Sequence, residues 1–332
     1  NPVYLNPKNS MELIVNSNKK KLSVDVVSGI ENLKTRVHLK VPEGIKVQPE
    51  FYDVELFAKG EIKTFEFNIS LPNEKKLISE VYYEADINGD FYSRALENII
   101  YDHITPQTRF PKSDVSLIKF DINFKANKIA YLMGSGDKVP ESLSLVGYEV
   151  DLLEKSDINI NKLKNYDALI IGVRAFNSDK SLYDIKSQIT DYMNGGGNVI
   201  VQYNTSRNID VNKFAPYPFK LSRNRVSQED AKVEIINKNH EVLNYPNKIK
   251  LEDFDGWVQE RGLYFPVSWS NEYQTVISSN DVGEDPNDGG ILISKVGEGY
   301  FVYTSYSWFR QLPAGVGGAY KIFSNILSLG KK

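Results

Sequence analysis

The sequence predicts two domains, an antiparallel β-sandwich followed by a predominantly parallel α/β domain. Apolar residues alternate with polar ones from about residue 21 to 87, as in strands with one buried face. Later, two continuous apolar runs at residues 168–171 and 199–201 flank a segment with helical periodicity, which is typical of a parallel strand, helix, strand unit. The 332 residues also exceed what one core usually holds. We place the boundary between residues 1–118 and 119–332.

The first domain is predicted from three alternating segments. Leu22, Val24 and Val26 point to one face, and residues 37–41 and 65–71 repeat the pattern. Turn-forming Pro, Gly and Asn separate the segments, and no helix is predicted among them. Residues 101–125 lack clear periodicity, so we interpret them as the last sandwich strand and a linker.

The second domain begins with a predicted strand at residues 128–133. A short helix ending near Gly147 and a strand at residues 149–153 follow. Gly134 and Gly136 lie directly after the first strand, but the third glycine of a dinucleotide fingerprint is missing. We therefore predict no cofactor.

The centre of this domain is predicted from residues 166–204. A strand (168–173), a helix (181–194), a glycine break (195–197) and a second strand (198–203) follow one another. Ser181 with Asp184 resembles a capping box, and Gly195 is expected to adopt the left-handed C-cap conformation. A hairpin (290–294 and 300–305) and a final helix complete the domain; its buried stripe is Ala319, Ile322, Phe323, Ile326 and Leu327.

Candidate ligand-binding residues follow the predicted strands, because ligands of open α/β sheets gather at the carboxyl ends of the strands. These residues are Arg174, Asn177, Gln202, Asn204, Trp308 and Arg310.

The segment at residues 253–265 supplies four further candidates, Asp255, Trp257, Glu260 and Arg261. Its mixture of charges and aromatic rings does not suit an ordinary core strand. Two interpretations stay open: a pocket wall that orients a polar ligand against Trp257, or an ion-pair loop that braces the sheet.

Composition excludes several classes of function. A net charge of −3 gives no basic face for nucleic acid, and no apolar run is long enough to span a membrane. The sequence has no cysteine, so disulfides, thiol nucleophiles and cysteine-ligated metals are absent. The acidic residues at 281–288 lack the order of a calcium loop and read as a turn, so we predict no metal site.

Each domain resembles a known fold family. Residues 13–87 share their strand and turn spacing with immunoglobulin-like modules that accompany carbohydrate-binding and glycosidase domains. The second domain resembles the flavodoxin-like, class I glutamine amidotransferase-like fold. That family places a catalytic Cys after the second strand, where this sequence has Gln202, Tyr203 and Asn204. The resemblance therefore implies a scaffold without its chemistry, a pseudoenzyme, and no glutaminase activity.

The second domain also resembles ThuA-like proteins in its triple glycine, the Asn239-His240-Glu241 segment and the hairpin at residues 297–304. Where members of that group commonly carry a His after the hairpin, this sequence has Tyr306 and Trp308.

Five strings resemble the C-terminal region of large exported bacterial PIG-L/LmbE-type deacetylases. They are IGVRAFN (171–177), VQYN (201–204), APYP (215–218), DGWVQERGLYF (255–265) and FRQLPAG (309–315). The resemblance implies export and an N-terminal zinc deacetylase domain as partner. Because nothing here matches the His-Pro-Asp-Asp zinc motif of the family, and the chain begins at Asn1, we expect an upstream segment.

Two hypotheses follow. The first is a non-catalytic accessory module that binds a carbohydrate, whose apolar faces stack on an aromatic ring while its hydroxyls bind polar side chains. The second is a hydrolase acting on a carbohydrate-type substrate through a carboxylate pair drawn from Asp255, Glu260 and Glu284.

Overall fold

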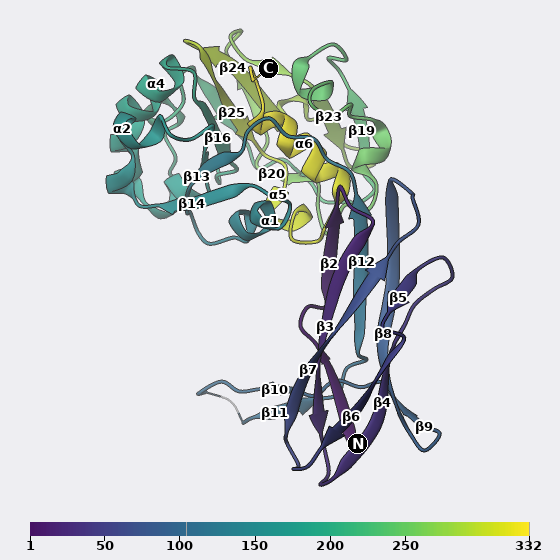
Figure 1. Ribbon diagram of the computed structural model, residues 1–332. Coiled ribbons are helices and arrows are strands. Elements are labelled where there is room, and N and C mark those ends of the chain that lie inside the picture. Colours follow the sequence, from purple (N-terminus) through teal and green to yellow (C-terminus); the bar gives the residue numbers. More distant parts are fainter. Residues whose placement is uncertain (104, 332) are drawn as a thin grey trace. The chain divides into compact units, whose positions relative to one another are not determined.

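The computed structural model describes residues 1–103 and 105–331 and divides into two compact units, Asn1–Asp121 and Ile122–Lys332 (Figure 1). The predicted boundary at residue 118 falls inside the last strand of the first unit, β12 (Asp114–Phe120). This strand continues to Phe120 because its backbone pairs with neighbours on both sides as far as that residue. Residue 104, within the predicted linker, lies outside the described residues.

The first unit is a sandwich of two sheets, as the alternating pattern predicts. One sheet has the order β1 (Val3–Pro7), β3 (Lys19–Ser28), β7 (Ile62–Ser70) and β5 (Lys46–Gln48). The other has the order β2 (Met11–Val15), β12, β8 (Lys76–Ile87), β4 (Leu33–Lys40) and β6 (Phe51–Leu56), with β9 (Asp90–Tyr92) on β8. A separate hairpin joins β10 (Glu97–Ile99) and β11 (Gln107–Arg109).

The sandwich core confirms which face of each strand is buried. Leu22, Val24 and Val26 from one sheet meet Val37 and Val81 from the other in one apolar cluster. Nearly all of the pairings are antiparallel, but β2 lies parallel to β12. The strands of this sheet that come first and last along the chain, β2 and β12, are therefore neighbours.

The second unit is built on a seven-stranded sheet. Its order is β14 (Glu149–Leu153), β13 (Lys128–Leu132), β15 (Ala168–Ile171), β16 (Asn198–Gln202), β25 (Gly299–Thr304), β24 (Ile291–Val296) and β22 (Gln274–Thr275). The first five strands are parallel to one another, and the last two are antiparallel additions. The predicted strands at 168–173 and 198–203 are thus parallel and interior, and each ends one or two residues earlier than expected.

Short helices lie on either face of this sheet (Figure 1). They are α1 (Val139–Leu145), α2 (Ile160–Leu163), α3 (Ala175–Ser178), α4 (Lys186–Asn194), α5 (Trp308–Gln311) and α6 (Gly317–Leu327). Side chains of α4 join Leu169, Ile171 and Val199 in one core cluster. The predicted stripe of α6 is buried as expected, at 0% exposure for all five of its residues.

The helix predicted at residues 181–194 is instead two elements, the 3-10 helix η2 (Lys180–Ile185) and α4. The carboxylate of Asp179, not Ser181, caps the start and accepts a hydrogen bond from the Ser181 amide. At the other end, Gly196 has the positive φ of +96°, whereas the expected Gly195 has −86°. The chain reverses one residue later than predicted because Gly195 still completes the last helical turn through its bond to Asp191.

Smaller elements surround the sheet. Three two-stranded ladders pair β17 (Phe219–Leu221) with β21 (Pro266–Trp269), β18 (Arg225–Val226) with β20 (Gly262–Leu263), and β19 (Lys232–Ile235) with β23 (Ile277–Asn280). The remaining 3-10 turns are η1 (Lys155–Asp157), η3 (Val211–Lys213), η4 (Glu241–Leu243), η5 (Leu251–Phe254) and η6 (Asp288–Gly290).

Candidate functional site

The carboxyl ends of four parallel strands, β13, β15, β16 and β25, share one edge of the sheet. Gly134 and Val173 follow the first two of these strands. A Cβ on Gly134 would lie 2.1 Å from the Val173 carbonyl oxygen, so only glycine allows the two ends to approach so closely. The Gly134 and Gly136 pair thus has a structural reason, since Gly136 takes a φ of +94° in the following turn.

Tyr203 lies at the centre of this edge, directly after β16. Its ring is parallel to that of Tyr264, with centroids 6.2 Å apart, and lies 5.4 Å from the ring of Phe309. Val173 and Leu263 complete the apolar cluster around it. Tyr203 is buried, whereas Tyr264 and Phe309 are partly exposed. We call Tyr203, Tyr264 and Phe309 the aromatic ledge.

Three charged side chains surround the aromatic ledge. Glu260 and Arg310 form an ion pair of 2.6 Å, and the Arg310 guanidinium lies 4.9 Å from the centre of the Phe309 ring. Burial raises the pKa of Tyr203; the charges of Arg174 and Arg310 oppose that rise, and the charge of Glu260 adds to it. Arg174, Glu260 and Arg310, all three predicted from the sequence, are therefore brought together around one hydroxyl.

Arg174 differs from Arg310 in having no carboxylate partner within the described part of the chain. Its side chain is exposed, and its backbone amide donates to the Tyr203 carbonyl at 2.9 Å. One guanidinium at this edge is thus free to bind a ligand, and the three charges sum to one positive charge.

The backbone around the ledge is strained. Arg174, Gln259 and Tyr264 have φ values of 56°, 64° and 55°, in the left-handed region that residues with a Cβ disfavour. Such residues cost about 1–2 kcal/mol each and occur preferentially at functional sites. Their gathering on the two segments that flank Tyr203 marks this edge as a candidate binding site.

Gln202 and Asn204 lie beneath this surface and do not line it, in contrast to the prediction. Both side chains are buried; each side-chain nitrogen donates a hydrogen bond inside the sheet, whereas each side-chain oxygen has no hydrogen-bond partner within the described residues. The Gln202 amide nitrogen donates to the Tyr131 hydroxyl at 2.7 Å, and Tyr131 in turn donates to Asp137. The Asn204 amide nitrogen donates to the Gln202 carbonyl at 3.0 Å. Both residues support the ends of the strands.

Trp257 and Trp308 are core residues, which corrects their assignment as ligand-binding candidates. Trp257 is 2% exposed and Trp308 is 0% exposed. Their rings meet edge to face at 5.4 Å, and each indole nitrogen already donates, to the Asp253 carbonyl and the Thr304 hydroxyl. Neither ring is available for stacking against a sugar.

Arg261 and Asn177 also have internal roles. The buried Arg261 guanidinium donates to the carbonyls of Phe254 and Ala231. The Asn177 side chain holds the loop after β16, accepting from the Thr205 amide at 2.7 Å and donating to the Thr205 carbonyl. Among the described residues of the segment 253–265, Glu260 is the one charged side chain that acts on Tyr203. The Asp255 side chain is exposed and makes no hydrogen bond or ion pair within the described part of the chain.

The ledge residues themselves were not among the sequence candidates. Tyr203 is the last residue of a predicted strand, which was the available signal. Tyr264 and Phe309 are distant in sequence from Tyr203 and carry no charge, so no local pattern marks them as site residues.

The carboxylates of the hydrolase hypothesis have separate surroundings. Glu260 is held by Arg310, whereas Glu284 lines a depression with Arg223 and Arg225. The Asp281 carboxylate accepts hydrogen bonds from the amides of Ser227 and Gln228, and its carbonyl accepts one from the Glu284 amide, which closes a turn. No group of three or more His, Cys, Asp or Glu residues within 1–103 and 105–331 could hold a metal ion.

His240 caps η4 with its ring, since Nδ1 accepts a hydrogen bond from the Val242 amide at 3.1 Å. Burial lowers the pKa of His240, so the unfolded chain binds a proton more readily than the folded one. This contribution to stability is present above the unfolded pKa of about 6.5 and is lost as pH falls.

We expect acidification from pH 7 to pH 5 to destabilise the parent chain more than the His240→Asn variant, because only the parent carries a buried imidazole that must bind a proton. Asparagine keeps a capping acceptor and does not titrate. Urea unfolding at both pH values measures the difference, and parallel pH profiles of the two proteins would argue against it.

Neither a family model nor a curated protein matches the sequence. Among solved structures, a β-galactosidase from the Antarctic haloarchaeon Halorubrum lacusprofundi is 13% identical, with a TM-score of 0.30, over 62% of this chain and 30% of that chain. Alpha-2-macroglobulin from Escherichia coli, from domain MG7 to its C-terminus, is 12% identical, with a TM-score of 0.24, over 38% of this chain and 18% of that chain. A protein of unknown function from Porphyromonas gingivalis W83 is 12% identical, with a TM-score of 0.23, over 41% of this chain and 61% of that chain.

The chain thus spans less than two thirds of each of these structures, and at such TM-scores none of them defines its fold or its function. Within the described residues, no helix has both the length and the apolar character needed to cross a membrane.

Proposed function

We propose that this chain is a non-catalytic accessory module that binds a glycan, belonging to an exported deacetylase of the PIG-L/LmbE type. The proposal combines an immunoglobulin-like sandwich with an amidotransferase-like domain that has no Cys nucleophile. The five sequence strings support the family, and two of them contain Arg174 and Arg310. An N-terminal zinc deacetylase domain is the proposed partner.

The observation that carries the binding proposal is the aromatic ledge beside the unpaired Arg174. Sugar rings present apolar C–H faces that pack on aromatic rings, and hydroxyl or acetamido oxygens that accept hydrogen bonds from a guanidinium. Tyr264 and Phe309 are the partly exposed rings, in place of the buried Trp257. Because the local charge is positive, we expect acetylated amino-sugars to bind better than free amino-sugars, whose ammonium groups Arg174 repels.

Arg174→Ala should weaken binding of an acetylated amino-sugar by roughly 1–3 kcal/mol, because a ligand oxygen loses its charged donor. Calorimetry of the full chain against acetylated and free amino-sugars measures this. Arg223→Ala, which removes another exposed arginine outside the ledge, is the matched control and should bind normally. Absence of sugar binding by the parent chain, or equal affinity in the Arg174 variant, would contradict the proposal.

Two substitutions at Arg174 distinguish the strain of its backbone from its role in ligand binding. Arg174→Gly should be more stable than Arg174→Ala by about 1 kcal/mol, since glycine adopts a φ of +56° without steric cost. Both variants should lose affinity alike. Urea unfolding of the two variants tests this, and equal stability would show that the left-handed conformation is not strained.

The family assignment has its own test in the coding sequence upstream of Asn1. An adjoining zinc-deacetylase segment would support the accessory role. A start codon and signal peptide directly before Asn1 would count against that role while leaving export in place.

A further inference from the structure

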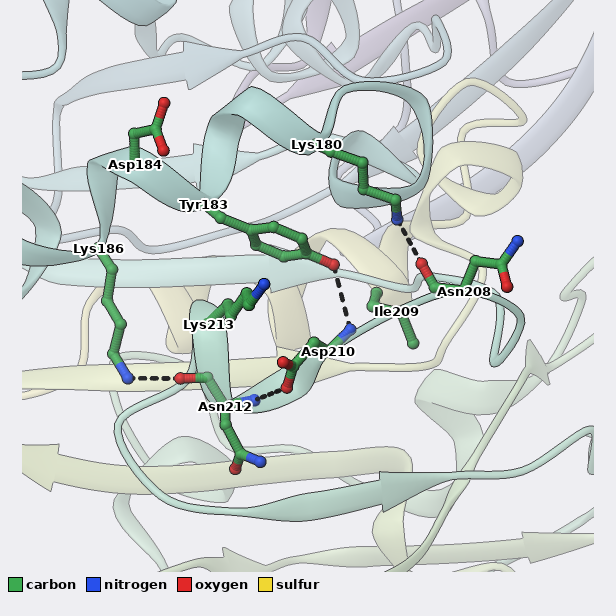
Figure 2. Close-up of a pocket in the computed structure, with 9 residues that line it drawn as sticks. All are labelled: Lys180, Tyr183, Asp184, Lys186, Asn208, Ile209, Asp210, Asn212 and Lys213. Carbon is green, nitrogen blue, oxygen red and sulfur yellow. Dashed lines mark hydrogen bonds between the residues drawn. The ribbon is translucent and has the colours of Figure 1, made fainter.

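A second depression lies beside η2, in a part of the unit that shares no lining residue with the aromatic ledge. It has a volume of about 850 Å³, and η2, α4 and the loop leading into η3 form its walls (Figure 2). Three lysines, Lys180, Lys186 and Lys213, line it together with Tyr183.

The ring of Tyr183 offers this depression little apolar surface. The ring stacks on Phe176 at a centroid distance of 5.6 Å and an interplanar angle of 8°. The ammonium nitrogens of Lys180 and Lys213 each lie 5.5 Å from its centre. The Tyr183 hydroxyl accepts a hydrogen bond from the Asp210 amide at 3.1 Å. Since ammonium groups occupy the neighbourhood of the ring, the depression is not suited to stacking a neutral sugar.

The lysines retain unused hydrogen-bond donors. Each ammonium has three N–H groups. The Lys180 ammonium donates to the carbonyls of Phe176 and Asn208. The Lys186 ammonium donates to the carbonyl of Asn212 at 2.6 Å (Figure 2). The Lys213 ammonium makes no hydrogen bond or ion pair within the described residues. Free N–H donors therefore remain on all three ammonium groups, and Lys213 has the most.

The carboxylates of the depression are already occupied. Asp184 forms an ion pair with Lys155 at 2.8 Å. Asp210 accepts the amide of Asn212 at 3.1 Å, which fixes it as the cap of η3. The lining lysines therefore outnumber the lining carboxylates, and neither carboxylate is paired with Lys186 or Lys213.

We propose that this depression binds an oxyanion, namely a sulfate, phosphate or carboxylate group, held chiefly by Lys213 and Lys186. Charge-assisted hydrogen bonds from the ammonium groups would satisfy their free donors. The proposal is independent of glycan binding at the aromatic ledge. The oxyanion is either a free ion or an acidic substituent of a larger molecule.

Sodium sulfate is the first probe, titrated into the full chain and followed by amide chemical shifts, with sodium chloride at matched ionic strength as reference. Saturable shifts confined to residues around 180–186 and 208–213 are expected with sulfate alone. Lys213→Ala should weaken the affinity for sulfate about fivefold, because one exposed charge contact is lost. The substitution keeps the hydrogen bond from the Lys213 backbone amide to the Asp210 carbonyl, so the variant is expected to fold.

Lys220→Ala is the matched control, since Lys220 is an exposed lysine of β17 that does not line the depression. Shifts that chloride reproduces, or an equal affinity in the Lys213 and Lys220 variants, would overturn the proposal. A sulfated disaccharide compared with its unsulfated parent distinguishes the sources. Tighter binding than free sulfate identifies a substituent on a larger molecule, and equal binding identifies the ion itself.

Discussion

Replacing Trp257 with alanine is expected to lower the free energy of unfolding of the second unit by about 3–5 kcal/mol. The ring is 2% exposed and packs edge to face on both Tyr306, at 5.7 Å, and Trp308, at 5.4 Å. Its removal leaves a cavity that aromatic neighbours held in their own contacts cannot fill. Urea denaturation followed by circular dichroism measures the loss.

Trp269→Ala provides the matched control, because Trp269 is a partly exposed tryptophan packed at the margin of the core. Loss of the Trp269 ring should lower the free energy of unfolding by clearly less than loss of the Trp257 ring. The folded fraction of the Trp257 variant should bind sugar as the parent does. A variant with the stability of the parent that fails to bind sugar would restore Trp257 to a role in ligand binding.

Arg261→Ala is expected to lower the free energy of unfolding by about 2–5 kcal/mol, since it leaves two buried carbonyls without their donor. The guanidinium bridges the carbonyls of Phe254 and Ala231, the latter at 2.9 Å, and lies 5.5 Å from the Trp257 ring. Burial lowers the pKa of Arg261, as expected of a cation removed from water. Its bonds join η5 to the segment that leads into β19. The sequence left an ion-pair loop as one of two alternatives; Arg261 instead joins these segments through backbone carbonyls and forms no ion pair within the described residues.

Arg225→Ala tests whether burial is the reason for the loss of stability expected in Arg261→Ala. Arg225 is an exposed arginine on β18, the strand that pairs with β20. Its loss should change the free energy of unfolding by no more than about 0.5 kcal/mol. Similar losses in both variants, measured by urea unfolding, would show that Arg261 acts through its charge and not through the two carbonyls.

Sequence periodicity was sufficient to predict the strands in which every residue, or every second residue, is buried. The strands Ala168–Ile171 and Asn198–Gln202, which contain the apolar runs 168–171 and 199–201, are buried at every position, so they could be assigned as parallel strands without knowledge of their neighbours. The alternation of Leu22, Val24 and Val26 was equally direct. Predicted boundaries failed where a single side chain decides them, as at Asp179, whose carboxylate captures the Ser181 amide.

The candidate site could be predicted only in part. Arg174 and Arg310 were found because they follow strands, and Glu260 because charged residues need partners. Tyr264 was missed because its position depends on the pairing of Gly262–Leu263 with Arg225–Val226, which no local pattern reveals. Trp257 was misassigned because its indole nitrogen finds a carbonyl only four residues away, at Asp253. A tryptophan within a charged segment gives no sign of such a local partner.

The parallel pairing of β2 with β12 has a consequence for the order in which the first unit folds. Met11 to Val15 are made early, yet their partners in the sheet, residues 116–120, emerge from the ribosome about a hundred residues later. Closing so long a loop is slow, so β2 waits without its strand partner while most of the sandwich is synthesised. An unpaired apolar strand readily joins a neighbouring chain. A nascent chain that stalls before β12 is complete would therefore be prone to association through residues 11–15.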